Sequence, residues 1–240
     1  MTGSNPGDIA ARFGDLGPLA AEVAALPWSG RSLTLTRPTD MDHLLDRVAD
    51  DPEQNLPYWA ELWPSGVALA DAILRDPSAV AGQRVLEVGC GIGTTAAAAL
   101  LAGADLTVCD YFPEALAFCR ATCLANVGRE PRAFAVNWRS PDPAVMADAG
   151  APFPVILAAD VLYEARDVEP MLGFVAETVA PGGLLWLAEP GRPPAQLWLD
   201  AVRNLGWHVE STTHPGPWPD PKDNANGVVV GLHRVTVAGG

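Results

Sequence analysis

Lysine is almost absent from this chain, since only Lys222 is a lysine among its 15 basic residues. Acidic residues number 29, and the formal net charge is −14. A chain this acidic repels phosphate backbones, so we expect no nucleic-acid partner. Its field would attract a cationic partner such as a lysine-bearing protein surface, although a need for solubility explains the charge about as well.

Cysteines and long apolar runs are also scarce. The four cysteines are Cys90, Cys109, Cys119 and Cys123. All four fall in expected strands and helices and none has a histidine in a recognisable pairing motif, so we expect buried thiols and assign no metal, disulfide or catalytic thiol. The longest apolar stretch, 94–104, is too short to span a bilayer, and the N-terminus lacks the basic-then-apolar order of a signal peptide. We therefore expect a cytoplasmic protein with no membrane partner.

From residue 83 onward, apolar strand patterns alternate with helical ones. Strands are expected at 83–88, 105–110, 132–137, 154–160 and 183–189, and helices near 94–103, 113–126, 167–179 and 194–205. This alternation predicts an α/β fold with parallel strands and helices on both faces. The runs 207–211 and 228–237 flank a loop rich in Pro, Asp and Asn and should pair antiparallel at the edge of the sheet.

The N-terminal part has a different composition. Residues 1–30 are rich in Gly, Pro and Ala with one short amphipathic stretch, and they precede an alternating strand pattern at 31–37 and a helical one at 40–48. We expect residues 1–56 to form an extension that packs on a main domain at 57–240. That domain should open with a helix that Ser65 caps.

The segment VLEVGCGIG at 85–93 reads as a buried strand that leads into a helix. It contains Gly89, Gly91 and Gly93. Glycine has no Cβ to keep a ligand from the backbone, and the helix N-terminus offers unpaired amides. A second apolar strand ends on Asp110, whose carboxylate could accept hydrogen bonds from the two hydroxyls of a ribose. The sequence therefore predicts a nucleoside cofactor.

Glycine spacing alone leaves the cofactor open, because GIGTTA also fits the dinucleotide pattern of a nicotinamide-dependent reductase. Glu87 favours another reading, since E-x-G-x-G-x-G resembles motif I of class I S-adenosylmethionine-dependent methyltransferases. In the alternative interpretation, Glu87 only caps a helix dipole or pairs with an arginine.

Three more segments strengthen this resemblance. PYWAELWPSG at 57–66, ADVLY at 159–163 and AEPGRP at 188–193 resemble elements of the seven-β-strand protein lysine methyltransferases, including the electron-transfer-flavoprotein β-subunit lysine methyltransferases and their bacterial relatives. The resemblance implies S-adenosylmethionine as cofactor and a Rossmann-like, doubly wound, mostly parallel sheet of seven strands with a reversed last strand. It makes 57–240 the methyltransferase domain.

The resemblance also implies site residues. Those expected at the cofactor are Trp59, Glu87, Gly89, Cys90, Gly91, Gly93, Asp110, Trp138 and Ala159. The indole of Trp138 could cover an adenine, while Asp110 holds the ribose. The alternative for Trp59, Trp63 and Trp138 is ordinary packing in the core.

Asp160 and Tyr163 are the expected catalytic residues, because both follow a strand at the edge where open α/β sheets bind ligands. A carboxylate raises the pKa of a nearby amine, so we expect Asp160 to orient the acceptor rather than to act as its base, with Tyr163 as a wall. Asp160 could instead cap the segment that follows. Glu189, where the family usually has Asp, and Arg192 are expected on the substrate side, although Arg192 could tie down its loop through a carboxylate.

The sequence thus predicts N-methylation of lysine in a protein by a monomer or weak oligomer. A small amine as acceptor, a nicotinamide-dependent reductase and a non-catalytic binding protein are the alternatives, because fold alone does not decide substrate.

Overall fold

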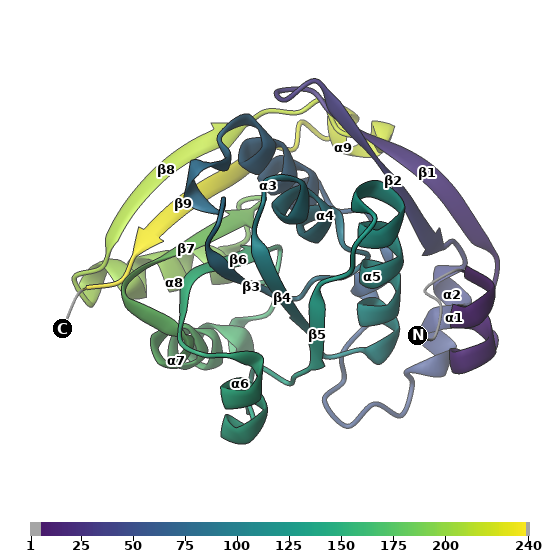
Figure 1. Ribbon diagram of the computed structural model, residues 1–240, viewed down its shortest axis with the longest axis horizontal. Coiled ribbons are helices and arrows are strands. Elements are labelled where there is room, and N and C mark those ends of the chain that lie inside the picture. The colour runs from purple at the N-terminus through teal and green to yellow at the C-terminus, as the bar shows by residue number, and fades with distance from the viewer. Residues whose placement is uncertain (1–5, 239–240) are drawn as a thin grey trace.

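A seven-stranded sheet lies at the centre of the computed structural model, which describes residues 6–238 (Figure 1). Its strands are β3 (Arg84–Val88), β4 (Asp105–Asp110), β5 (Arg132–Ala135), β6 (Phe153–Ala159), β7 (Val179–Glu189), β8 (His208–His214) and β9 (Val230–Thr236). Their spatial order is β5-β4-β3-β6-β7-β9-β8. β9 is antiparallel to both of its neighbours, whereas the other paired strands are parallel. The predicted mostly parallel sheet with a reversed last strand is confirmed.

The strand order changes direction between β3 and β6. From β3 the chain moves outward through β4 and β5, then returns to place β6 and β7 on the other side. At such a reversal, the loops after neighbouring strands separate and leave a crevice at the carboxyl edge of the sheet. The segments that carry motif I and the ADVLY sequence both end at this crevice.

Helices cover both faces of the sheet, as predicted. They are α1 (Pro6–Phe13), α2 (Met41–Arg47), α3 (Pro64–Arg75), α4 (Thr94–Leu101), α5 (Pro113–Val127), α6 (Pro143–Ala149), α7 (Val168–Thr178), α8 (Pro193–Asn204) and α9 (Pro221–Ala225), with 3-10 turns η1 (Tyr58–Ala60), η2 (Pro77–Ala79) and η3 (Ala165–Asp167). Figure 1 shows α3, α4 and α5 on one side and α6, α7 and α8 on the other. Successive residues of β3 serve the two cores, since Val85 packs towards α4 and Leu86 packs on the side of α7 and α8.

The N-terminal part adds an antiparallel hairpin of β1 (Leu19–Leu26) and β2 (Arg31–Pro38). The sequence predicts β2 but not β1, because LAAEVAAL has the composition of a helix and forms a strand by pairing with β2. Leu26, Leu33 and Leu35 are buried in the core of α3, α4 and α5. Residues 1–5 of the expected extension lie outside the described part of the chain, and its boundary at residue 56 stays a prediction.

Two local predictions differ from the structure. Ser65 does not cap α3, because Pro64 occupies the first helical position, where its fixed φ is favourable and its missing N–H is not needed, and the preceding Trp63 is the cap residue. The structure also has two short helices that the sequence does not predict, α6 and α9. None of the helices within residues 6–238 is long and apolar enough to cross a bilayer.

Candidate active site

The crevice between β3 and β6 is a cavity of about 940 Å³, counting its open mouth. The predicted residues that line it are Trp59, Glu87, Gly89, Cys90, Gly91, Asp110, Trp138, Ala159, Asp160 and Tyr163. Gly93, Glu189 and Arg192 are not among its lining residues. The fold therefore gathers segments from 59 to 163 around one space.

Two glycines of motif I form a backbone cradle in this cavity. Gly89 has φ +66°, and a Cβ there would come within 2.8 Å of Val161 Cγ1. Gly91 has φ +49°, and its Cβ would meet the carbonyl oxygen of Trp59 at 3.1 Å. Both positions combine a left-handed conformation with a close approach of chain segments, so only glycine fits without strain. This cradle is what motif I predicts.

Gly93 lies where α4 meets α5 and is not among the residues that line the cavity. It lies at the start of α4 with φ +87°, and a Cβ there would come 2.7 Å from the Cα of Cys119 on α5. Its lack of a side chain lets the two helices approach, and it does not expose backbone to the cavity.

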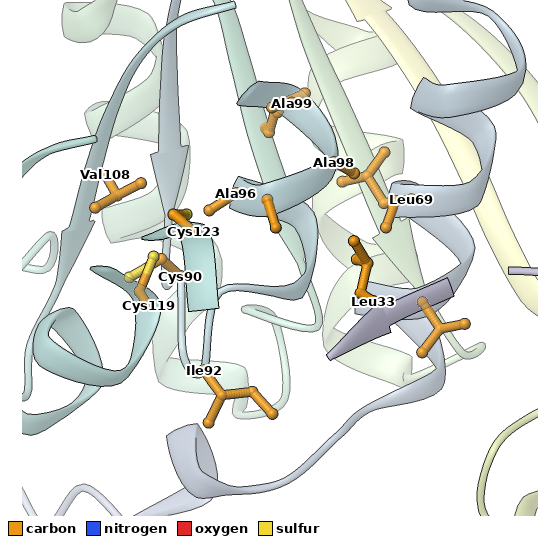
Figure 2. Close-up of a cluster of buried hydrophobic side chains, with 14 of the residues drawn as sticks. Leu33, Leu69, Cys90, Ile92, Ala96, Ala98, Ala99, Val108, Cys119 and Cys123 are labelled. Carbon is orange, nitrogen blue, oxygen red and sulfur yellow. The ribbon is translucent and has the colours of Figure 1, made fainter. Parts of the chain in front are cut away.

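The cysteines are free and buried, as predicted. Figure 2 shows Cys90 and Cys119 side by side where the motif I loop meets α5. Burial is the main cause that raises the pKa of Cys90 to about 12, so its thiol stays protonated at neutral pH. These thiols act as small apolar side chains under the glycine loop.

Glu87 is a buried carboxyl group, one oxygen of which has no hydrogen-bond partner among residues 6–238. Its side chain lines the cavity and is 3% exposed, and its Oε2 makes no hydrogen bond within the described chain. Burial, and then the nearby Asp110, raise its pKa well above the usual range. The predicted alternative of an arginine partner is therefore not what the structure shows for this oxygen. A buried acceptor left unsatisfied is costly, and a cationic ligand group in the cavity would satisfy it.

Asp110 is held rigidly at the end of β4. Its Oδ2 accepts a hydrogen bond from the backbone N–H of Gly91 at 3.0 Å, and its Oδ1 accepts one from that of Phe112 at 3.0 Å. Burial raises the pKa of Asp110 to about 6, and these hydrogen bonds limit the rise. Each carboxylate oxygen keeps a lone pair for a further donor, so the group can still accept from two hydroxyls.

Asp160 follows β6 in the left-handed region with φ +56°, and its backbone N–H donates to the carbonyl of Ala188 on β7. Its carboxylate pairs with Arg192, whose Nε donates to Oδ1 at 2.6 Å and whose Nη2 donates to Oδ2 at 3.2 Å. The interpretation of Asp160 as a cap for the next segment is wrong, since Glu164 forms that cap. The alternative that Arg192 ties its loop to a carboxylate is confirmed.

Three aromatic side chains, Tyr58, Trp63 and Tyr163, form one wall of the cavity. The sequence does not predict Tyr58 as one of them. Tyr58 meets Tyr163 edge-on with ring centroids 5.6 Å apart, and it meets Trp63 in the same way at 5.8 Å. Burial raises the pKa of Tyr163 to about 12, so its hydroxyl stays protonated. The aromatic residues of the PYWAELW segment are the local pattern that could have indicated Tyr58. Only the fold brings that segment into contact with Tyr163.

Glu189 supports the loop that carries Arg192 instead of facing the cavity. Its Oε2 accepts from the backbone N–H groups of Gly191 at 2.5 Å and Arg192 at 3.0 Å, and His233 Nε2 lies 3.1 Å from its Oε1. Burial would raise the pKa of Glu189, but the bonds from His233 and the two amides leave it lowered. Glu189 is thus an ionised group that holds the loop of Arg192, and Arg192 in turn pairs with Asp160.

Sequence reasoning missed Arg139, which closes the cavity from another side. Its Nε donates to the buried Asp167 at 2.7 Å, and its Nη1 donates to Asn55 Oδ1 at 2.7 Å. Tyr111 donates from its hydroxyl to Asp51 at 2.6 Å. These bonds hold the segment 51–56 at the cavity, and no local pattern reveals them because the partners come from distant parts of the chain.

The charges of the cavity favour a cationic ligand. Glu87, Asp110 and Asp160 contribute carboxyl groups, and the lining residue Arg139 is already paired with Asp167. The negative charge of these groups would repel the pyrophosphate of a nicotinamide dinucleotide. A sulfonium cofactor with a cationic amino group suits this charge distribution.

Comparisons with known proteins find methyltransferases. The methyltransferase domain family matches residues 86–185. The electron transfer flavoprotein beta subunit lysine methyltransferase of Xenopus laevis is 31% identical over 138 residues, which cover 57% of this chain and 53% of that protein. The histone-arginine methyltransferase METTL23 of Xenopus laevis is 29% identical over 171 residues, or 69% of this chain and 67% of that protein. The chain thus spans about half the length of the first of these relatives.

Among solved structures, the N-methyltransferase NodS from Bradyrhizobium japonicum in complex with S-adenosyl-L-homocysteine has the same fold. It superposes with a TM-score of 0.53 at 18% identity and covers 82% of this chain and 97% of its own. Residues 86–185 therefore match the methyltransferase domain family, and the chain has the fold of the class I S-adenosylmethionine-dependent methyltransferases, as motif I predicts.

Proposed function

We propose that this protein uses S-adenosylmethionine to methylate the side-chain nitrogen of lysine in a protein. The observation that carries the proposal is the buried Oε2 of Glu87, which has no hydrogen-bond partner among the described residues, beside the Gly89–Gly91 cradle at the reversal of strand order. The relatives named as lysine and arginine methyltransferases of proteins support an acceptor nitrogen on a protein surface.

The residues of the cavity fit the parts of this cofactor. Glu87 would bind the cationic amino group of its methionine end, and Asp110 would accept hydrogen bonds from the ribose hydroxyls. The amides of the glycine cradle and the indole of Trp138 would hold the rest. When bound, the sulfonium supplies an electrophilic methyl group, and the protein's main task is to align the acceptor with it.

On the acceptor side, Asp160 would accept an N–H hydrogen bond and orient the amine, while Tyr58, Trp63 and Tyr163 form the wall of its channel. An unperturbed lysine has a pKa of about 10.4, so keeping its amine neutral at pH 7 costs roughly 4 to 5 kcal/mol. Aromatic walls that exclude water lower this pKa and favour the reactive neutral form.

Two experiments test the proposal. Calorimetric titration should show binding of S-adenosylmethionine and none of NAD. Transfer of a labelled methyl group into a size-fractionated lysate should label protein, and mass spectrometry should place the label on lysine. Label on arginine, or only in the small-molecule fraction, would replace the lysine acceptor by one of those nitrogens, and a protein that binds neither cofactor would be a non-catalytic one.

The pH dependence of cofactor binding should report Asp110. The ionised carboxylate accepts from the ribose hydroxyls, so affinity for S-adenosylmethionine should fall as the pH drops below about 6, the pKa of this group. For folding the sign is opposite: the raised pKa favours the protonated folded state, so this contribution to stability is present at low pH and is lost as the pH rises through 6. Calorimetry from pH 5 to 8 measures the affinity, and Asp110→Asn should remove the inflection.

Asp160→Asn should lower kcat by about tenfold, because an amide orients the amine less well than a carboxylate. The dissociation constant of S-adenosylmethionine should stay within about twofold of the wild type, since Asp160 is assigned to the acceptor side. Asp200→Asn, on the exposed surface of α8, is the matched control. Methyl transfer by Asp160→Asn at the wild-type rate would refute the orienting role.

Cytoplasmic location and a monomeric or weakly associating state belong to the same proposal. The four free cysteines are compatible with a reducing compartment. Fractionation and size-exclusion chromatography with light scattering would test these points.

A further inference from the structure

The ion pair of Asp160 and Arg192 joins the cavity to its rim. Arg192 Nε donates to one carboxylate oxygen of Asp160 and Nη2 donates to the other, and the side chains of Asp160 and Arg192 are 5% and 35% exposed respectively. Three features fix the position of Arg192. Its backbone N–H donates to the carboxylate of Glu189, and it is the cap residue before the first turn of α8. Its guanidinium lies 5.7 Å from the centre of the Trp63 ring. Such a built contact indicates a role beyond a surface ion pair, which usually contributes little.

An isolated carboxylate at Asp160 would conflict with methyl transfer to an amine. A lone negative charge beside the acceptor stabilises its ammonium form and raises its pKa, by about 1 to 3 units at close range. Only the neutral amine has the lone pair that attacks the methyl carbon. A carboxylate whose charge is balanced can still accept an N–H bond, because Arg192 leaves lone pairs on both of its oxygens.

We propose that Arg192 is a positioning residue that balances the charge of Asp160, so that Asp160 orients the acceptor amine without holding it protonated. This inference rests on the proposed function. It assigns to Arg192 an effect on the protonation of the acceptor that a role in tying the loop would not produce.

The other groups around Asp160 leave this task to Arg192. Glu189 on β7 adds negative charge, but His233 on β9 and two backbone amides bind it. Tyr58 on η1 and Tyr163 after β6 are the neighbouring phenols, and neither supplies a positive charge. Burial raises the pKa of Asp160, and the hydrogen bond and charge of Arg192 limit this rise, so the ion pair favours the ionised carboxylate against its burial.

The first test measures the carboxyl group directly and needs no acceptor. In a protein labelled with ¹³C at aspartate side chains, the resonance of Asp160 is followed against pH. Arg192→Gln should raise the pKa of Asp160 by about 1 to 3 units, whereas Arg192→Lys should stay close to the wild type. Arg203→Gln, which removes an exposed ion pair from the same helix, is the control and should leave the resonance unchanged. An equal pKa in the wild type and Arg192→Gln would overturn the inference.

The second test is the pH profile of methyl transfer to poly-L-lysine and to the lysate protein. In Arg192→Gln the rising limb of kcat should shift by one unit or more to higher pH, so that transfer is about tenfold slower at pH 7.5 and approaches the wild type at high pH. Arg192→Lys should restore the position of the limb. A uniform loss at every pH would indicate a merely structural role and overturn the inference. If the wild type binds S-adenosylmethionine but labels no lysine in either acceptor, the proposed function itself fails and the inference with it.

Discussion

Glu87→Gln is expected to weaken the binding of S-adenosylmethionine by about 10- to 100-fold, the scale of one hydrogen bond to a charged group. The glutamine keeps the shape of the side chain but loses the negative charge that we assign to the cofactor's amino group. Calorimetry at pH 7.5 measures the loss. Glu177→Gln on the exposed side of α7 is the matched control and should bind as the wild type does.

The same substitution should stabilise the protein without ligand, which separates loss of a ligand contact from damage to the fold. Because burial raises the pKa of Glu87, its contribution to stability is present at low pH and is lost as the pH rises towards the pKa of the folded state. The gain in Tm from Glu87→Gln should therefore be larger at pH 8 than at pH 5. Unchanged affinity, or a Tm that falls at pH 8, would contradict the assignment of Glu87 as a charge reserved for a ligand.

Gly93→Ala is expected to destabilise the fold by about 2 to 5 kcal/mol, the sum of a left-handed alanine and an overpacked helix contact. The new Cβ would lie 2.7 Å from Cys119 Cα and 3.0 Å from its carbonyl oxygen, and backbone atoms cannot rotate away. Urea unfolding followed by circular dichroism measures the free energy of unfolding.

Gly128→Ala is the control for this prediction. Gly128 also has a positive φ, +75°, at the end of α5, but its Cβ would meet nothing within 4 Å. Gly128→Ala should lower the free energy of unfolding only by the cost of a left-handed alanine, about 1 to 2 kcal/mol. Equal losses in the two variants would show that α4 and α5 adjust freely and that the close packing at Gly93 carries no energetic weight.

Much of the fold was predictable, because its signals are local. The strand at β4 and the helices at α5 and α8 lie within one or two residues of their predicted bounds, since apolar periodicity, prolines and glycines act over a few neighbouring residues. β1 shows the limit of such reasoning. Its alanines favour a helix, and pairing with β2 over the core outweighs that local preference.

The residues of the site likewise fall into those that a local motif predicts and those that only the fold reveals. Motif I predicted Glu87 and the cradle of Gly89 and Gly91, because a nucleoside site needs exposed backbone and a carboxylate at fixed spacing. The bonds from Arg139 and Tyr111 to the segment 51–56 were invisible, because their partners lie 60 to 84 residues apart in the chain. No short pattern records a contact of that range.

By itself, the sequence determined the kind of protein: an acidic α/β chain with a nucleoside loop and four motifs that resemble those of methyltransferases. Only the tertiary structure decided which contacts the predicted residues make. Gly93 packs between two helices, Glu189 accepts a hydrogen bond from the loop that carries Arg192, and Arg192 pairs with Asp160. The physical reason is that residue type and spacing specify local conformation, whereas burial and charge pairing depend on which distant segments the folded sheet brings together.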